Sequence, residues 1–435
     1  MAPNVTSTTT MFLAEAAVCP TAALKQRHLP SMSSMAAPRP SMAPVSQTVG
    51  QTVGQIVAQP ATAPMSPTAT APMSPTATAT PTAMLLRDRA KPDPYAWKIV
   101  WRNVLAFVYL HYAAVRGVYL ILTGQLHFYT YLWTVLLIGL SAEGITAGAH
   151  RLWAHRAYKA KWQLRTLLML CQTLAFQNHI YEWVRDHRVH HKFTDTDADP
   201  HNASRGFFFS HMGWLMVRKH PDVRTKGAGV DLSDLERDPI VMFQKKFYLV
   251  LMPLIAFVMP AMVPAKLWGE SGWTAWYACS MARYTLALHG TWLVNSAAHI
   301  WGMRPVDKSI SPTENVFVAH VAFGEGWHNY HHVFPWDYKA AELGNYKGNF
   351  TTAFIDFFAR LGWAYDLKTV SKEMVEKRVR RTGDGSHPYA QQAHRDDGHH
   401  HHHHHHDHGE EVWGWGDRDM SQDDILSATI INKAD

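Results

Sequence analysis

Four long apolar stretches limit the folds that this chain can adopt more than any other feature. They cover residues 104–122, 129–149, 247–264 and 273–298. A helix needs about 20 apolar residues to cross a bilayer core roughly 30 Å thick, and each stretch approaches that length. The mean hydropathy of -0.19 hides them, because polar ends dilute the apolar middle. We therefore expect an all-α integral membrane protein with four transmembrane helices, with membrane lipid and no nucleic acid among its partners.

The distribution of Lys and Arg predicts the orientation in the membrane. Residues 150–246, between the second and third stretches, contain sixteen of these residues. The two short loops at 123–128 and 265–272 contain only Lys266. Because positively charged loops stay on the cytosolic side, residues 150–246 and 299–386 are expected to form a cytosolic helical cap, with both termini also in the cytosol.

Both ends of the chain have the composition of tails. The first 83 residues are rich in Pro, Ser, Thr and Ala, and the octad at 61–68 is repeated directly after itself. Such segments cannot bury enough apolar surface to fold. A run of histidines, His399–His406, marks the other end. We expect three regions: a disordered tail at 1–83, a membrane domain at 84–386 and a mostly disordered His-rich tail at 387–435.

Three histidine clusters indicate a metal site. Residues three and four apart share one face of a helix, so the histidines within the second and third clusters should converge. Neutral imidazole suits iron, zinc and copper. Eight ligands are too many for one ion and about right for two, whereas a solvated polar helix face would explain one cluster better than all three. The clusters are His150-Arg-Leu-Trp-Ala-His155, His187-Arg-Val-His190-His191 and His328-Asn-Tyr-His331-His332.

The metal site is expected immediately above the membrane. His150 begins where the second apolar stretch ends, and His299 directly follows the fourth. Glu143 precedes His150 by seven residues, about two helical turns, which would put both on one face. Glu143 and its neighbour Ala142 are therefore candidates for lining a tunnel or supporting a ligand. A partnered structural charge is an equally good interpretation of Glu143.

An all-histidine site beside a membrane indicates iron that activates dioxygen against a lipid-soluble substrate. Unactivated C–H bonds resist acid and base chemistry, and breaking one needs an oxidising centre that the metal supplies. Soluble two-iron proteins use paired Glu-x-x-His motifs, and the chain has one match, Glu325 to His328. It has no His-Glu-x-x-His motif of a zinc protease.

The chain resembles the membrane fatty acyl-CoA desaturases, and within them the insect acyl-CoA delta-9 type. The resemblance runs from about Lys98 to Ser386 and resumes at Trp413–Gly416, without covering the N-terminal tail or the histidine run. Each motif alone is moderately specific, and the combination is highly specific. The motifs are Gly144–His155, Arg185–Lys192, Asp199–Asn202, Gly206–His211, Asn295–His299 and Gly324–His332.

This resemblance implies a cap that holds two Fe ions over the membrane helices. Asn295 would complete one iron site through a water molecule. The implied ligands are His150, His155, His187, His190, His191, His299, His328, His331 and His332. The anionic CoA head group would dock on polar and basic residues outside the membrane. The implied contacts are Asn103, Asn178, Trp183, Arg185, Asp186, Arg218 and Lys219.

The resemblance also implies the reaction. Two hydrogens leave neighbouring methylenes of a saturated fatty acyl-CoA, dioxygen is reduced to water, and a cis double bond forms, with delta-9 as the favoured position. Electrons would come from a cytochrome b-type carrier, itself reduced by a flavin reductase that uses NADH, at the endoplasmic reticulum membrane. Glu143 and His179 depart from the family's usual residues and leave acyl chain length and bond position open.

Two other functions fit parts of the pattern. A membrane alkyl or fatty acyl hydroxylase would use the same kind of metal centre, and only the full set of motifs and head-group positions favours desaturation. A metal transporter would explain the histidine run, but transport ligands should lie within the spans, whereas these clusters flank them on one side. Product analysis distinguishes a hydroxylase from a desaturase, and measurements of metal uptake distinguish a transporter from an enzyme.

Overall fold

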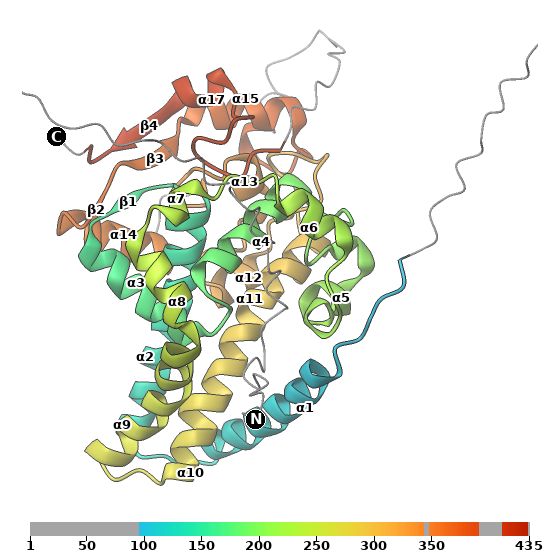
Figure 1. Ribbon diagram of the computed structural model, residues 1–435. Coiled ribbons are helices and arrows are strands. Elements are labelled where there is room, and N and C mark those ends of the chain that lie inside the picture. Colours follow the sequence, from blue (N-terminus) through green and yellow to red (C-terminus); the bar gives the residue numbers. More distant parts are fainter. Residues whose placement is uncertain (1–94, 343–347, 391–410, 434–435) are drawn as a thin grey trace, which may run out of the picture. The chain divides into compact units, whose positions relative to one another are not determined.

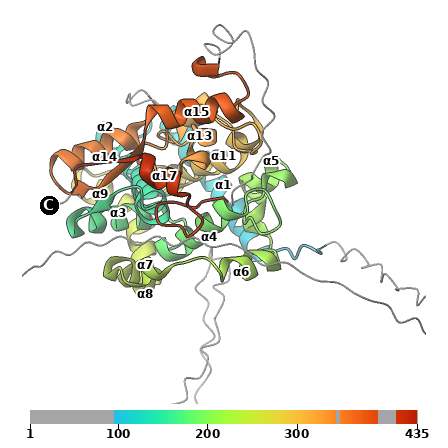
Figure 2. The same ribbon diagram turned by 90° about the horizontal axis from the view of Figure 1, so that it is seen from above.

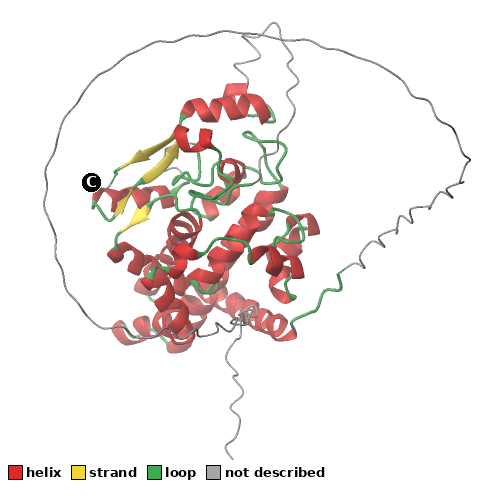
Figure 3. Ribbon diagram, turned by 45° about the horizontal axis from the view of Figure 1, so that its top comes forward, coloured by secondary structure: helices red, strands yellow, loops and turns green. Residues whose placement is uncertain are grey.

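The structure is a computed structural model that describes residues 95–342, 348–390 and 411–433. The expected N-terminal tail and the histidine run lie outside the described residues. The described part is mostly helical and contains two small two-stranded sheets, as Figure 3 shows. In Figure 1 the long helices lie in the lower part, and the shorter helices gather above them. The long helices are α1 (Trp101–Leu122), α2 (Phe128–Glu143), α8 (Pro239–Pro253) with α9 (Met259–Leu267), and α11 (Arg283–Ile300).

Three of the described helices are long and apolar enough to cross a membrane. They span Trp101–Leu122, Phe128–Ala154 and Pro239–Leu267 and contain the first three expected stretches. The first is α1. The second joins α2 (Phe128–Glu143) to a π-helical turn, η1 (Gly144–Ala154). The third is built from α8 (Pro239–Pro253), the π-helical η4 (Leu254–Val258) and α9 (Met259–Leu267).

The fourth expected stretch is also helical, but it is more polar than the other three. It forms an unbroken run of α10 (Gly272–Ala275), the π-helical η5 (Trp276–Ala282) and α11 (Arg283–Ile300). Among the described helices, this run is not apolar enough to count as a membrane span by length and composition. The structure therefore supports a mostly helical, multi-pass membrane protein.

Arg283 is fully buried where three of these helices meet. A π-helical turn displaces a backbone carbonyl from its usual partner, and buried carbonyls need a replacement donor. The guanidinium of Arg283 supplies it: it donates to the carbonyls of Cys279 in η5 and Ala256 in η4, both at 2.9 Å, and to Ser141 Oγ of α2 at 2.8 Å. An arginine that is costly in a membrane thereby joins α2, η4 and α11.

Above these helices lies a cap of short elements, seen from above in Figure 2. Two antiparallel pairs, β1 (Lys159–Ala160) with β2 (Ala364–Tyr365) and β3 (Leu367–Val370) with β4 (Ala428–Ile431), tie its outer layer together. The cap helices are α3 (Trp162–Ala175), α4 (Ile180–Lys192), η2 (Ala203–Arg205), α5 (Phe207–His211), η3 (Gly213–Met216), α6 (Pro221–Gly227), α7 (Ser233–Glu236), α12 (Val316–Val321), α13 (His328–Val333), α14 (Phe350–Arg360), α15 (Lys372–Thr382) and α17 (Gln422–Ser427).

The cap has its own apolar core, which positions α4. Leu164 and Leu168 of α3 and Ile180 and Val184 of α4 are four residues apart in each helix and fully buried in one cluster. Each such side chain contributes roughly 1.5–3 kcal/mol. His179 begins α4 as its N-cap, with Nδ1 accepting from the backbone N–H of Glu182 at 3.1 Å. The opposite side of α4 is thereby free to present histidines.

Residues 411–433 lie within the expected C-terminal tail, and the structure gives them defined elements. They form α17 and β4, and the register of β4 against β3 pairs Ile431 with Leu367. Buried Trp413 and Met420 also pack into the cap. Residues 411–433 are thus attached to the cap.

Candidate metal centre

Nine buried or half-buried histidines gather in two groups within the cap, and they are the nine histidines expected as ligands. In each group the candidate ligand atoms lie within 4.8 Å of one another. The second and third sequence clusters are each divided between the two groups. The first group is His150, His155, His187, His191 and His331, and the second is His190, His299, His328 and His332.

The π-helical turn η1 explains the spacing of the first cluster. A π-helix bonds each N–H to the carbonyl five residues earlier, and the N–H of His155 donates to the carbonyl of His150 at 3.1 Å. Their rings lie 4.7 Å apart. Glu143 lies just before this turn, where a seven-residue spacing no longer equals two α-helical turns. The expectation that Glu143 shares a face with His150 assumed an α-helix.

The Nε2 atoms within each group face one another at hydrogen-bond distance. His331 Nε2 lies 3.0 Å from His150 Nε2 and 3.2 Å from His191 Nε2. A neutral imidazole carries one N–H, so one hydrogen cannot serve both contacts. Converging lone pairs of this kind fit a cation, and the all-nitrogen donor set suits iron, zinc or copper.

The outer nitrogens of three histidines have acceptors that fix their tautomers. His190 Nδ1 lies 2.8 Å from Asp199 Oδ2, and His299 Nδ1 lies 3.0 Å from Asp195 Oδ2. His155 Nδ1 donates to a backbone carbonyl at 2.5 Å. Such partners hold the hydrogen on Nδ1 and leave Nε2 as the ligand atom, as at metal sites generally. Asp195 and Asp199, in the acidic segment after the second cluster, were not identified from the sequence as supporting residues.

Burial keeps most of these imidazoles neutral. It lowers the pKa values of His187 and His191 well below their ordinary range, and neighbouring imidazoles lower them further. For His190, burial lowers the pKa, but Asp199 and other nearby carboxylates together raise it above its ordinary value. Burial raises the pKa of Glu325, but Arg151 and an adjacent histidine bring it down to about 2. Neutral imidazoles beside an ionised carboxylate are the protonation states that metal binding needs.

An apolar cavity runs from the histidine groups down between the membrane helices. The metal end includes His150, His190 and His328, and the far end is walled by α2 and α11. Ala142 lines this cavity, whereas Glu143 is not among the described lining residues. Thr146 Oγ1 instead lies 3.5 Å from Glu143 Oε2. The far walls consist of Ile138, Ser141, Ala142, Ile145, Leu286, Ala287, Gly290 and Val294.

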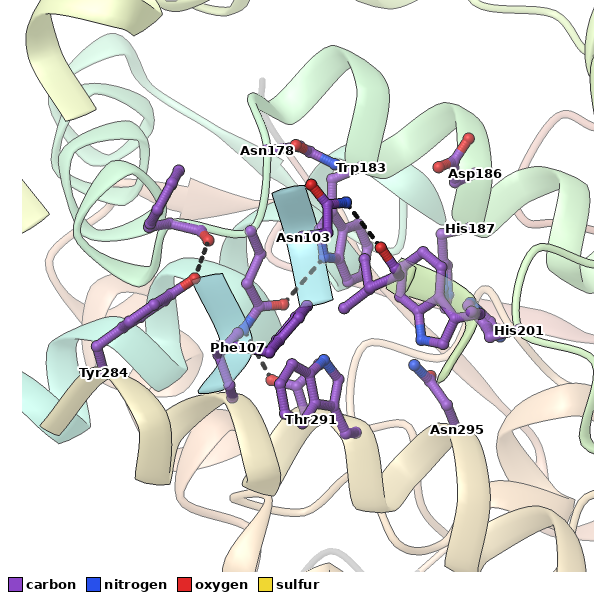
Figure 4. A pocket seen from close by; sticks show the side chains of 16 residues that line it. Asn103, Phe107, Asn178, Trp183, Asp186, His187, His201, Tyr284, Thr291 and Asn295 are labelled. Atoms are coloured by element: carbon purple, nitrogen blue, oxygen red, sulfur yellow. Dashed lines mark hydrogen bonds between the residues drawn. The ribbon is translucent and has the colours of Figure 1, made fainter. Parts of the chain in front are cut away.

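A second cavity, shown in Figure 4, adjoins the first, and its lining includes residues of α1 and α11. The two share Gln177, Trp183, His187, Thr291 and Asn295 in their linings. Four of the expected head-group contacts line the second cavity, which are Asn103, Asn178, Trp183 and Asp186.

A third, basic cavity shares part of its wall with the second. Asn103, Trp214 and Leu215 line both. Its cationic lining consists of Arg102, Arg218, Lys219 and Arg224, which includes two more of the expected contacts.

Arg185, the remaining expected contact, is not among the described residues that line these cavities. Its Nη2 lies 2.8 Å from Asp186 Oδ1, and Lys219 pairs with the other oxygen of the same carboxylate. The pKa of Arg185 is raised, chiefly by Asp186. Arg185 therefore orients a residue of the cavity wall.

Comparison with known proteins agrees with this arrangement. A model of the fatty acid desaturase family matches residues 126–341. An acyl-CoA delta-9 desaturase of Acheta domesticus is 62% identical over 338 residues, which are 78% of this chain and 88% of that protein. An acyl-CoA delta-12 desaturase of the same insect is 58% identical over 339 residues, with the same two coverages. The human stearoyl-CoA desaturase is 53% identical over 301 residues, 69% of this chain and 83% of the human protein. The chain therefore belongs to the fatty acid desaturase family of oxidoreductases.

Proposed function

We propose that this acyl-CoA desaturase forms a cis double bond, at the delta-9 position, in a saturated fatty acyl-CoA. The observation that carries the proposal is the series of cavities with shared walls. It begins at basic residues, passes both histidine groups and ends between apolar membrane helices. An amphipathic substrate with an anionic head and a long alkyl tail matches this order of surfaces. A relative of 62% identity is named as a delta-9 desaturase and another of 58% as a delta-12 desaturase.

Two iron ions would be held by the two histidine groups. Five imidazoles would bind one ion and four the other. Asn295, which lines both inner cavities, would complete the four-histidine site through a water molecule. Bound iron supplies the oxidising power that removes hydrogen from unactivated methylenes. The protein's part is to keep the imidazoles neutral and oriented, and to place one carbon pair beside them.

The head group would bind at the basic cavity. Arg218, Lys219 and Arg224 line it together with Arg102, and charge-assisted hydrogen bonds from such side chains suit phosphates. Two buried polar atoms in its shared wall, Asn103 Oδ1 and Trp214 Nε1, have no partner within the described residues. Unpaired buried polar groups are costly, so these atoms suit the amide and thioester groups of an acyl-CoA.

The acyl chain would bend where the two inner cavities meet. Trp183 Nε1 donates to Gln177 Oε1 at 3.3 Å, and Gln177 Nε2 donates to Thr291 Oγ1 at 2.9 Å. These three residues line both cavities. A bend held by their hydrogen bonds would bring the reacting methylenes alongside the histidines and set the position of the double bond.

The remaining expectations follow from the family and the charge distribution. The run from Gly272 to Ile300 would be the fourth transmembrane helix. The cap would face the cytosol from the endoplasmic reticulum membrane, with both termini on the same side. A cytochrome b-type carrier, reduced by its NADH-dependent reductase, would deliver two electrons for each double bond. Membership in an oxidoreductase family disfavours the metal-transporter alternative.

Product analysis tests the proposal directly. The chain would be expressed in yeast that lacks its own desaturase, and microsomes would receive stearoyl-CoA, NADH and dioxygen. Gas chromatography with mass spectrometry should detect the cis delta-9 acid. A hydroxylated acid without alkene would overturn desaturation in favour of the hydroxylase, and a delta-11 or delta-12 alkene would overturn only the bond position.

A further inference from the structure

Residues 411–420, which we name the C-terminal strap, hold the metal-site residue His155 from two sides. The ring Nδ1 of His155 donates to the backbone carbonyl of Trp413 at 2.5 Å. The backbone carbonyl of His155 accepts from the N–H of Trp415 at 2.9 Å. A segment 258 residues away in sequence therefore fixes both the ring and the main chain of one histidine.

The strap can approach this closely because Gly414 lies between the two tryptophans. A Cβ atom at Gly414 would lie 2.5 Å from the carbonyl oxygen of His155 and 2.7 Å from its Cα. Such contacts are too short for any side chain. Only glycine at position 414 therefore allows the strap to contact His155.

Charged residues of the cap fix the strap in place. The ring of buried Trp413 packs under the guanidinium of Arg188, 4.0 Å from the ring centre, in a cation–π contact. Asp417 Oδ2 accepts from the N–H of Trp413 at 2.9 Å and lies 2.8 Å from Lys192 Nζ. Arg188 and Lys192 belong to α4, the helix that presents three of the nine histidines. The strap is thus anchored to the same helix as the site.

The support of His155 differs from that of other histidines in the site. His190 and His299 face the carboxylates of Asp199 and Asp195, which come from the loop directly after α4. His155 depends on a neutral carbonyl from the end of the chain. Loss of the strap would remove this acceptor without changing any metal-site histidine, and it would leave the His155 ring free to turn.

We propose that the C-terminal strap is a positioning element for the metal held by the first histidine group. The Trp413 carbonyl keeps the ring hydrogen of His155 on Nδ1 and so turns the Nε2 lone pair towards the metal. This inference rests on the proposed function, because it requires His155 to be a metal ligand. It predicts that the strap controls how long the protein retains one of its two metal ions.

The test compares metal retention in three purified proteins. One is the full chain. The second ends at Glu410, which removes the strap together with α17 and β4 and keeps the histidine run. The third is the full chain with serine in place of His399–His406, which keeps the strap.

Iron per protein would be measured by elemental analysis, and iron loss into a ferrous chelator would be followed with time. Altered support of a metal-bound histidine typically costs 10–100-fold in affinity. We expect one iron to leave the shortened chain at least about 10-fold faster, and the serine variant to match the full chain.

A point variant keeps the test valid if the shortened chain does not fold. Gly414→Ala should push the strap away from His155 and speed the loss of one iron in the same way. Its control, Leu426→Ala, changes a side chain of α17 that is 81% exposed. Equal loss rates for Gly414→Ala and Leu426→Ala, with two irons in the full chain, would overturn the strap proposal alone. A full chain that never holds iron would overturn the proposed function and the strap proposal with it.

Discussion

His150 and Glu325 face each other inside the cap, with Nδ1 of the ring 2.9 Å from Oε2 of the carboxylate and both side chains almost fully buried. The other oxygen, Oε1, accepts from Arg151 through Nε at 3.1 Å and Nη2 at 2.8 Å. One carboxylate therefore lies against a metal-site histidine and neutralises the guanidinium beside it. Glu325 also precedes His328, a member of the four-histidine group, by three residues in the chain.

Replacing Glu325 by glutamine should weaken the metal site and the fold together. The amide keeps the shape but leaves the Arg151 guanidinium buried without a counter-charge, which costs about 3–5 kcal/mol. Iron affinity should fall about 10–100-fold. Thermal unfolding in detergent and iron content measure the two effects. Glu376→Gln is the matched control, because its pair with Arg380 lies on the surface and should change stability by less than about 1 kcal/mol. Equal effects of the two variants would contradict this role of Glu325.

His190→Ala should abolish activity and remove iron while the protein stays in the membrane. His190 belongs to the four-histidine group and is 1% exposed. Metal content, product formation and membrane extraction would be measured on the same preparation. His320→Ala is the control, because His320 is exposed and belongs to neither group. Normal turnover in the His190 variant would show that it is not a ligand.

A larger side chain at Ala142 should shorten the preferred acyl chain. Ala142 lines the far part of the apolar cavity, between α2 and α11, so Ala142→Leu reduces the room for the methyl end of the substrate. The ratio of products from palmitoyl-CoA and stearoyl-CoA should shift about 10-fold towards the shorter one, within the 1–3 kcal/mol typical of a methylene-sized change in a pocket. Val135→Leu, on the exposed side of α2 at 68% exposure, should leave the ratio unchanged. An unchanged ratio in both variants would place the chain terminus elsewhere.

Lys368 should make the stability of the protein rise with pH on the alkaline side. Burial, partly opposed by the Asp366 carboxylate, lowers the pKa of Lys368 to about 8. Between that value and the ordinary pKa of about 10.4, the unfolded chain holds a proton that the folded protein has released. The contribution of Lys368 to the free energy of unfolding should therefore increase with pH across this window, by about 3 kcal/mol at most.

Thermal unfolding at pH 8 and pH 10 checks this dependence. Lys368→Met should remove this contribution, because the site then carries no proton that differs between the two states. Lys372→Met, on the exposed side of α15, should keep it. The prediction fails if the Lys368 and Lys372 variants respond equally to pH.

Much of the metal centre was predictable because its residues are local in sequence. The spacing of His187, His190 and His191 fits an α-helix, and the structure has one there. His299 was predicted as a ligand only from the resemblance to a family, because the position of a single histidine gives no spacing pattern. The structure brings it within the four-histidine group.

Other features depended on contacts that no local pattern encodes. The prediction that Glu143 shares a helix face with His150 used the α-helical periodicity, which the π-helical turn η1 does not follow. The five-residue spacing of His150 and His155 was a signal for such a turn. The division of the second and third histidine clusters between the two groups depends on how α4, α11 and α13 pack. The contact of Trp413 with His155 joins residues 258 positions apart in the chain and follows only from the tertiary fold.

The guanidinium of Arg283 has a consequence for how this enzyme would select carbon atoms. It links α11, which carries Asn295 and His299, to Ser141 of α2, and both helices line the apolar cavity. The distance from the far end of the cavity to the metal site is constant only if the helices that carry the two do not move relative to each other. By joining α2 and α11, Arg283 would prevent thermal sliding between them. The number of methylenes between the far end of the cavity and the metal site would then stay fixed.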